Sequence, residues 1–358
     1  MRYRRSISLI LVILLTATIV LSGCARELRL TGETKTVTDI LGREVEIPVN
    51  PERIVCHYAA TAHMVALVGE TEKIIGAPEG IKRDILLRTL HPEIVNIASP
   101  MQAGTINAEE IVKIEPDIIL VRRYVAESVS ESEKLNNMGL PYVVLDFQNI
   151  DELKRCIEIV GEIFNKQDIA TSYLAYMDET FALVESRLEG LEENDKVSLF
   201  HSTQDPLRTA LAGSICEEIT DIAGVINVSM FEDLPTSDVT ADITIEQLYL
   251  WDPDVIVANE HYAVPYIMMN SRWTGLSAVI NERVLPMPLG ISRWGHHGSI
   301  EPHMAALFIA QLCYPNKFSD VYLEDIIADY YARFFIVPDI DDELLNRIIT
   351  GEGMREPK

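Results

Sequence analysis

One phrase occurs twice in this chain, and it restricts the folds open to the sequence more than any other feature. Residues 109–121 read EEIVKIEPDIILV, and residues 246–258 read EQLYLWDPDVIVA. The two copies align without a gap, so that Pro116 matches Pro253 and Asp117 matches Asp254. Any fold assigned to the chain must therefore hold the same local unit in each half.

Each copy predicts a helix, a stop and a buried strand. Asn107 and Thr244 are favourable N-caps, and Glu110 and Gln247, three residues later, fit a capping box. The residue before a proline is disfavoured in the helical region, so each helix ends there. The runs IILV and VIVA are continuously apolar, as in strands buried on both faces. Either the two halves are related copies, or the chain reuses a unit open to any α/β protein.

Strand-like and helical runs alternate through most of the sequence, which implies parallel sheets covered by helices. A hairpin is expected over residues 37–47, around a turn at Gly42. The expected strands are residues 53–56, 73–76, 118–121, 142–145, 197–200, 255–258 and 284–287, with helices at 108–114 and 129–138.

The strand signal stops between residues 151 and 193, where apolar residues recur at helical spacing. This predicts one helix near 151–165 and a long helix near 167–191. The last clear helix, near 322–335, is expected to close the structure. The expected fold is thus α/β, with two three-layer lobes of mostly parallel sheets joined by one long helix. The expected boundaries are 37–165 for the first lobe, 166–193 for the joining helix and 194–350 for the second lobe.

The N-terminus reads as a bacterial lipoprotein signal. Three arginines precede a short apolar run, and small residues come directly before Cys24. A cleaved signal of residues 1–23 would leave Cys24 to carry lipid, which stably anchors a protein when more than one chain is buried. Residues 24–36 are then a polar tether, and the protein is extracytoplasmic and lipid-anchored to the cell membrane. The alternative is an uncleaved N-terminal anchor.

Charge and cysteine content narrow the class further. The formal net charge is −25, and so acidic a surface repels phosphate backbones, so nucleic acid is not expected as a partner. The remaining cysteines are too widely spaced to indicate a disulfide framework. We expect buried free thiols, with one bridge as the alternative, at Cys56, Cys156, Cys216 and Cys313.

At this point a resemblance becomes specific. The opening TVTDILGREVEIPVNPERIV, the two E-x6-P-D phrases, LAGSICEEITDIAGVINV and EPHMAALFIAQLCYP resemble, in this order, the substrate-binding lipoproteins of ABC importers for iron–siderophore complexes, haem and cobalamin. The resemblance covers roughly residues 36–336. It implies a class III periplasmic-binding-protein fold, in which a stiff helix joins two lobes and limits their opening. It also implies a ligand held between the lobes.

The resemblance also gives Glu109 and Glu246 a role. In cobalamin-binding members of this family, a glutamate on each lobe pairs with arginines of the permease dimer, which works with its own ATPase. The matching positions here are Glu109 and Glu246, which the capping boxes leave unused. The alternative is that both glutamates only stabilise the positive end of their helix. We expect the protein itself to be a monomer without an intrinsic cofactor.

Ligands of open α/β sheets bind beyond the carboxyl ends of the strands, so the loops at those ends are the expected cleft. Histidine and tyrosine can bind a metal left partly open by its chelator. Arginine can pair with carboxylates of an anionic chelator, and aromatic rings offer flat faces. The expected cleft residues are His57, Tyr58, Arg122, Arg123, Tyr124, His201, His261, Tyr262, Arg293, Trp294, His296 and His297.

These residue types favour a metal chelate as the ligand, foremost a ferric siderophore or haem. Cobalamin or another transition-metal chelate is the alternative. The side chains that could reach the metal are Tyr124, His261, His296 and His297. Two other classes are weaker. A secreted metallohydrolase lacks support because the chain has no HExxH, GxSxG or GxxxxGK[ST] motif. A surface adhesin would leave the family motifs unexplained.

Overall fold

The computed structural model describes residues 32–102, 104–230, 234, 236–237, 240–337 and 340–355. The expected signal peptide, Cys24 and most of the expected tether lie outside these ranges. Across the described ranges, none of the helices combines the length and apolar character that spanning a membrane requires.

The first half of the chain forms a parallel sheet preceded by a hairpin. Strands β1 (Thr34–Thr38) and β2 (Glu44–Pro48) pair antiparallel as expected, with Gly42 at a φ of 76° in the turn. The sheet has the order β4-β3-β7-β8, and all of its neighbours are parallel. Its strands are β3 (Ile54–Cys56), β4 (Ile74–Gly76), β7 (Ile118–Val121) and β8 (Tyr142–Val144), and its main helices are α2 (Ala59–Leu67), α3 (Ile85–Leu90), α4 (Ala108–Lys113), α5 (Arg123–Glu127) and α6 (Val129–Met138).

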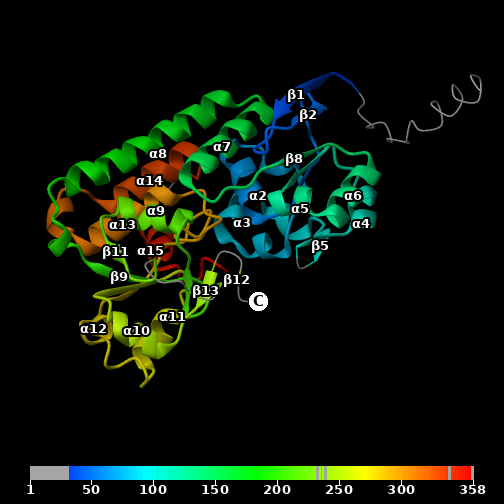
Figure 1. Cartoon of the computed structure of the whole chain (residues 1–358). Coiled ribbons are helices and arrows are strands. Elements are labelled where there is room, and N and C mark those ends of the chain that lie inside the picture. The colour runs from blue at the N-terminus through cyan, green and yellow to red at the C-terminus, as the bar shows by residue number, and fades with distance from the viewer. Residues whose placement is uncertain are drawn as a thin grey trace, which may run out of the picture.

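Two helices lead from this sheet to the next. Helix α7 (Ile150–Phe164) ends at Asn165, whose left-handed φ of 56° breaks the helical run, and α8 (Gln167–Leu188) follows. With 22 residues, α8 is about 33 Å long at 1.5 Å per residue. Figure 1 shows α8 lying along one side of the molecule, next to α7 at one end and above α13 and α14 further along. The long helix predicted from the sequence is confirmed and is a few residues shorter than expected.

The second sheet contains seven strands and is mixed. Its order is β12-β13-β10-β9-β14-β15, with β11 also paired to β9. Strands β9, β11, β14 and β15 pair in parallel, whereas β10 pairs antiparallel with both β9 and β13, and β12 pairs antiparallel with β13. The strands are β9 (Ser198–Ser202), β10 (Arg208–Ala210), β11 (Ile226–Asn227), β12 (Thr236–Ser237), β13 (Thr240–Asp242), β14 (Val255–Ala258) and β15 (Val284–Pro286).

Helices cover both faces of the second sheet as well. They are α9 (Ile215–Ile222), α10 (Ile245–Trp251), α11 (Ala263–Met269), α12 (Ser277–Ile280), α13 (Pro302–Cys313), α14 (Leu323–Phe334) and α15 (Asp342–Thr350). The sequence predicted α14 as the closing helix, yet α15 follows it. Helix α15 is amphipathic in sequence, but Ile348 is its single fully buried residue.

One hydrophobic core underlies both sheets. It joins one face of each sheet to α7, α8, α9 and α13, while two smaller cores fill the opposite faces. Cys56, Cys156, Cys216 and Cys313 are all buried and unbridged, so the expected free thiols are confirmed. Each half is therefore a three-layer α/β arrangement, and α8 lies in the core shared by both.

The repeated phrase is one structural unit present twice. The Asn107 and Thr244 side chains accept hydrogen bonds from the backbone N–H groups of Glu110 and Gln247, as the caps predict. Glu115 and Asp252 end their helices with left-handed φ values of 45° and 40°, rather than the extended backbone expected before proline. The reciprocal bond of the first capping box is not formed, because the Asn107 N–H donates to the Pro100 carbonyl.

The two aspartates of the phrase also act alike. Asp117 accepts the backbone N–H groups of Glu52 and Arg53 just ahead of β3, and Asp254 accepts that of Ser198 at the start of β9. Each aspartate thus fixes the beginning of the neighbouring parallel strand. This shared detail favours related copies over chance reuse of a common unit.

Candidate functional site

Loops at the carboxyl ends of both sheets enclose a cleft. The cleft contains three adjoining cavities, with volumes of about 70, 150 and 370 Å³. The smallest and most enclosed cavity shares Tyr58 with the largest and His297 with the intermediate one, and Arg122 lines both larger cavities. The first sheet contributes the loops after β3, β7 and β8, and the second contributes the loops after β10 and β15. The cleft therefore lies between the two halves.

Arg122 forms the centre of the wall built by the first sheet. It follows β7 directly, and its Nε lies 3.3 Å from both carboxylate oxygens of Asp146, which follows β8. The guanidinium carbon also lies 5.1 Å from the ring centre of Tyr58 and 5.7 Å from that of Tyr124. Arginine has five N–H donors, so the Asp146 contact fixes the guanidinium and leaves its Nη groups for a ligand.

Tyr124 and His57 complete this wall. The Tyr124 hydroxyl donates to the Gly104 carbonyl at 2.6 Å, and His57 Nε2 lies 3.0 Å from the same oxygen. A Cβ at position 104 would lie only 2.7 Å from the Tyr124 hydroxyl, and the φ there is +80°, so glycine is required. Burial lowers the pKa of His57, with a further lowering by the positive charge of Arg122.

The opposite wall is the loop between β15 and α13, which carries Arg293, His296 and His297. The two imidazole rings stack with their centres 3.9 Å apart, and His296 Nδ1 accepts the Gly298 backbone N–H. Burial, and then nearby positive charges, lower the pKa of His296 well below its usual value and that of His297 to about 4. Both rings are therefore neutral at physiological pH. Arg293 forms an ion pair with Glu260.

A buried carboxylate holds this loop in place. Glu301 is completely buried, and it accepts the Ser292 backbone N–H at 2.8 Å, the Ser292 hydroxyl at 2.6 Å and the Tyr331 hydroxyl. Its backbone N–H donates to the Ser299 hydroxyl. Glu301 lies directly before α13, and its side chain faces inward, where it fixes the segment leading to Arg293.

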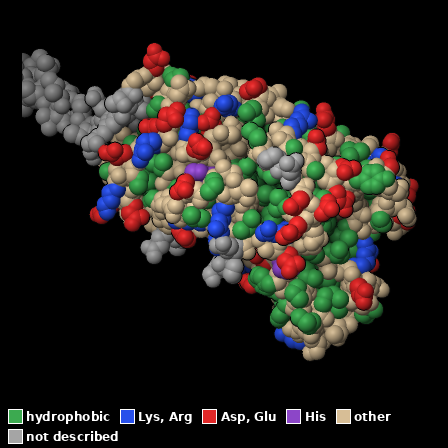
Figure 2. Space-filling view, turned by 180° about the vertical axis from the view of Figure 1, so that it is seen from behind, with side chains coloured by type: hydrophobic (Ala, Val, Ile, Leu, Met, Phe, Trp, Pro, Cys, Tyr) green, Lys and Arg blue, Asp and Glu red, His purple; other side chains and the backbone are tan. Residues whose placement is uncertain are grey.

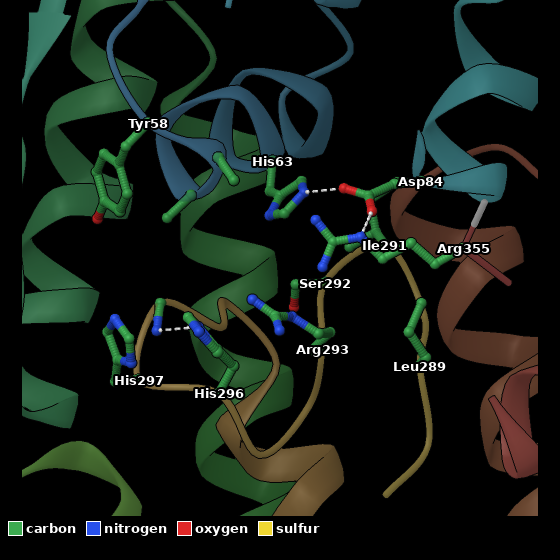
Figure 3. Close-up of a pocket in the computed structure, with 13 residues that line it drawn as sticks. Tyr58, His63, Asp84, Leu289, Ile291, Ser292, Arg293, His296, His297 and Arg355 are labelled. Carbon is green, nitrogen blue, oxygen red and sulfur yellow. Dashed lines mark hydrogen bonds and ion pairs between the residues drawn. The ribbon is translucent and has the colours of Figure 1, made fainter. Parts of the chain in front are cut away.

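The most enclosed cavity brings in residues that sequence reasoning missed. Figure 3 shows His63 of α2, Asp84 before α3, and Arg355 grouped beside the loop of Arg293 and His296. Asp84 lies 3.1 Å from Arg355 and 3.5 Å from His63. Neither Asp84 nor Arg355 directly follows a strand, so the rule of strand ends could not find them, whereas His63 follows β3 but lies inside α2, where a core role was expected. Asp146 does follow β8, and that rule could have included it.

The structure does not bring all twelve expected residues to the cleft. His201 and Trp294 are fully buried, His201 against Asn259 and Trp294 with its indole N–H donating to Tyr331. These positions correct the expectation. Side chains alternate between the two faces of a strand, and His201, near the end of β9, points into the core. Trp294 lies in a tightly packed loop that directs its indole into the core. Trp294 therefore offers no face to a macrocycle.

Three further expected residues also lie apart from the described cavities. Arg123 pairs with Glu152 at the start of α7. His261 and Tyr262 are exposed, with His261 Nδ1 lying 3.1 Å from the Thr350 carbonyl and the Tyr262 hydroxyl donating to the Gln204 carbonyl. Their loop begins at the strand end and then turns outward into α11. The expected residues that do line the cleft are His57, Tyr58, Arg122, Tyr124, Arg293, His296 and His297.

The chemistry of the cleft favours an anion over a bare metal ion. Arginines from both walls supply fixed cationic donors, and the imidazoles are neutral. Within the residues that the structure describes, no group of three His, Cys, Asp or Glu side chains is arranged to hold a metal ion. Desolvated arginine bonds to anionic oxygens are among the strongest that proteins form.

Glu109 and Glu246 lie in the first turns of α4 and α10, and both are exposed. Neither has an interaction partner among the described residues. Glu246 shares α10 with two exposed apolar side chains, Tyr249 and Leu250. Figure 2 shows apolar side chains gathered over the projecting end of the second half, where α10, α11 and α12 lie. The exposed large apolar residues there are Tyr249, Leu250, Tyr262, Tyr266, Met269 and Ile280.

Two three-layer α/β halves, a core helix shared by both and a cleft at the strand ends define a two-lobed solute-binding protein. The chain belongs to the periplasmic binding protein family, whose sequence profile matches residues 54–288. It is thus a solute-binding protein of the ABC-importer type, and not an enzyme. The expectations of family, fold and non-enzymatic class are confirmed.

Its relatives are distant in sequence and close in fold. The chain is 24% identical to the molybdate-binding protein MolA of Haemophilus influenzae, over 84% of this chain and 90% of MolA. It is 22% identical to the vitamin B12-binding protein of Vibrio cholerae, over 66% and 81%. A crystal structure of a periplasmic solute-binding protein from Veillonella parvula matches with a TM-score of 0.77 at 22% identity, covering 90% of this chain and all of that one. MolA bound to molybdate matches with a TM-score of 0.75 at 22% identity, over 85% and 98%.

Proposed function

We propose that this protein captures an anionic metal species in the cleft and delivers it to the permease of an ABC importer. The observation that carries the proposal is an arginine on each wall of the cleft, Arg293 at the smallest cavity and Arg122 at the two cavities that adjoin it. Each guanidinium is fixed by a carboxylate and lines a cavity beside neutral histidines. An anion that joins the two walls would hold the cleft closed, which is what a delivery protein requires.

Cavity size supports a compact tetrahedral oxyanion as the first candidate. A water molecule needs roughly 10–15 Å³ of cavity volume. The cavity of about 70 Å³ therefore has room for about five to seven water-sized positions. That space suits four oxygens around one metal atom. The likeness to MolA, whose name states that it binds molybdate, supports the same class of ligand.

The second candidate is the iron(III) chelate or haem expected from the sequence, with cobalamin behind it. The observation in its favour is the open cavity of about 370 Å³, which lies within the range of sites for larger organic ligands. Its lining includes Tyr124 and His57, side chains able to reach an incompletely chelated metal, and Arg122 for an anionic chelator.

A calorimetric titration panel tests these candidates. The purified soluble protein is titrated with molybdate, tungstate, sulfate, a ferric catecholate, a ferric hydroxamate, haem and cobalamin. We expect binding of molybdate or tungstate. Binding of only the large ligands would favour the second candidate, and binding of none would contradict the proposed function.

Substitutions then locate the site. Arg122→Gln and Arg293→Gln should each weaken binding about 10- to 100-fold, because a charged hydrogen bond contributes about 1.5–3 kcal/mol. Arg272→Gln removes the same charge from an exposed loop of the second half and should bind like the parent protein. Equal affinities in all three variants would place the ligand elsewhere.

The remaining roles belong to the same proposal. The protein is held outside the cytoplasm by lipid on Cys24, acts as a monomer, and contacts a permease dimer through Glu109 and Glu246. Their exposure, their matching places in the two copies of the repeat and their lack of partners among the described residues support that contact.

A further inference from the structure

The chain crosses from the second half back to the first after α15, through a segment that we call the C-terminal strap, residues 351–355. Gly351 ends α15 in a left-handed conformation, with a φ of 70°. Met354 is fully buried, and its carbonyl accepts the backbone N–H of Ile85 at 3.0 Å. Arg355 pairs with Asp84 in an antiparallel bridge. The strap therefore attaches to the first half by both backbone and side chain.

The other end of the strap is tied to the second half. The Leu289 N–H donates to the Ile348 carbonyl of α15 at 2.8 Å, just before the loop that carries Arg293. The Arg347 guanidinium donates to the Gly353 carbonyl at 2.6 Å. In Figure 1 the red end of the chain lies at the junction between the cyan and yellow regions. The strap is thus a second connection between the halves, beside the cleft and apart from α8.

Arg355 projects from this strap into the most enclosed cavity. Its Nε lies 3.1 Å from Asp84 Oδ1, and one Nη donates to the Gly80 carbonyl at 3.2 Å. Figure 3 shows the guanidinium groups of Arg355 and Arg293 both reaching into the space between His63 and His296. The positive charge of Arg355 adds to burial in lowering the pKa values of Arg293 and His296, so the groups are close.

Two guanidinium groups directed into one small cavity repel each other, and their carboxylate partners offset this only in part. Asp84 and Glu260 each hold one guanidinium by some of its donors. The remaining N–H groups lie at a cavity that also contains neutral imidazoles. An anion between the two guanidiniums would satisfy those donors and remove the repulsion.

We propose that Arg355 is a ligand-binding residue that the strap carries across the cleft. Arg355 binds the oxyanion together with Arg293, and its positive charge favours a doubly charged oxyanion over a singly charged one. Asp84 orients Arg355 and is a positioning residue. The inference rests on the proposed function, because it assumes an anionic ligand in the same cleft. The family profile ends at residue 288, so the strap lies outside the part of the chain that the profile matches.

Calorimetry with molybdate and perrhenate tests the inference. The two tetrahedral oxyanions have similar shapes, but molybdate carries two negative charges and perrhenate one. Arg355→Gln should weaken molybdate binding about 10- to 100-fold, with a smaller loss for perrhenate. Arg355→Lys should recover part of the molybdate affinity. Arg272→Gln serves as the charge-matched control and should behave like the parent protein.

The outcomes separate this inference from the proposed function. If the parent protein binds neither oxyanion, both ideas fail for this ligand class. If the parent protein binds molybdate and Arg355→Gln binds it equally well, only the role of Arg355 is overturned. If Arg355→Gln loses the same factor for both oxyanions, with a lower melting temperature without ligand, Arg355 merely pins the strap and the proposed role is again wrong.

Discussion

Buried neutral histidines are the most unusual residues of this protein. His303 in α13 is fully enclosed, with ring contacts to Tyr173, Tyr176, Phe181 and Tyr330 and no hydrogen-bond partner for either ring nitrogen. Burial lowers its pKa to about 3, and that of His297 is lowered to about 4. Nothing in the sequence separates His303 from an ordinary core residue. Its enclosure depends on α8 and α14, which come from distant parts of the chain.

These histidines predict acid sensitivity. Above pH 6.5 the imidazoles are neutral in both the folded and the unfolded state. Below pH 6.5 the unfolded chain binds protons that the folded protein refuses, so the free energy of unfolding falls as the pH falls, until the folded pKa is reached. The loss is about 1.4 kcal/mol per pH unit for each such histidine, or about 2 kcal/mol at pH 5.

Urea denaturation at pH 7.5, 6.0 and 5.0 measures this effect. A His303→Leu variant removes one titrating group and should show a shallower decline, by about the amount assigned to one histidine. An unchanged pH slope in that variant would show that His303 takes up a proton in the folded protein as readily as in the unfolded chain.

At the scale of elements, the two copies of the helix–stop–strand unit determine where the cleft and the proposed docking points lie. The first copy ends at β7, whose following loop carries Arg122 into the cleft, and the helix of each copy presents a glutamate to solvent that lines none of the described cavities. This arrangement makes the two functions separable by substitution.

Charge reversal at both glutamates tests the docking role. Glu109→Lys combined with Glu246→Lys should abolish ligand uptake in cells and leave ligand affinity in solution unchanged, because neither side chain lies at a cleft cavity. Glu185→Lys with Glu189→Lys, on and just beyond the exposed face of α8, is a control with the same charge change. Normal uptake by the Glu109→Lys, Glu246→Lys variant would show that these glutamates only stabilise their helices.

The contact between α7 and α8 gives a second prediction at this scale. A Cβ on Gly161 would lie 2.8 Å from the Cβ of Ala170, so a larger residue must push the helices apart. We expect Gly161→Ala to lower the free energy of unfolding by about 1–3 kcal/mol despite the better helix propensity of alanine. Urea denaturation measures it, and a stabilised variant would show that the helix pair yields without strain.

Local patterns predicted most of the elements, and long-range packing explains what they missed. The runs at 118–121 and 255–258 are strands β7 and β14. They could be predicted because a continuous apolar run between two stop signals is enough to indicate a buried strand. Within the site, the rule of strand ends found Arg122 and Tyr124. It could not find Arg355 or Asp84, which meet only because the strap returns across the molecule. It also could not tell that Trp294 would turn into the core.

At the scale of the whole molecule, the described part is one folded body on a predicted membrane tether. The shared core around α8 ties the sheets together, which leaves small hinge motions as the expected response to ligand. The anchor lies outside the described residues and stays a prediction from the sequence.

Metabolic labelling with a clickable fatty acid tests the anchor. The protein expressed in a bacterial host should take up label, partition into detergent and yield a mature N-terminus at Cys24. A Cys24→Ala variant should lose the label, because it lacks the thiol to which diacylglycerol is attached. A parent protein without label that keeps residues 1–23 in its mature form would instead support an uncleaved anchor.

The strap has a consequence for biosynthesis. Its contact with Ile85 joins one of the last described stretches of the chain to a helix formed from its first third. A chain emerging across a membrane exposes the first half long before residue 354 arrives. The first half must therefore wait, with its strap-binding surface uncovered, until residues 351–355 have crossed. Docking of the strap is then a late step of folding, and a chain shortened before residue 351 would expose that surface to proteases.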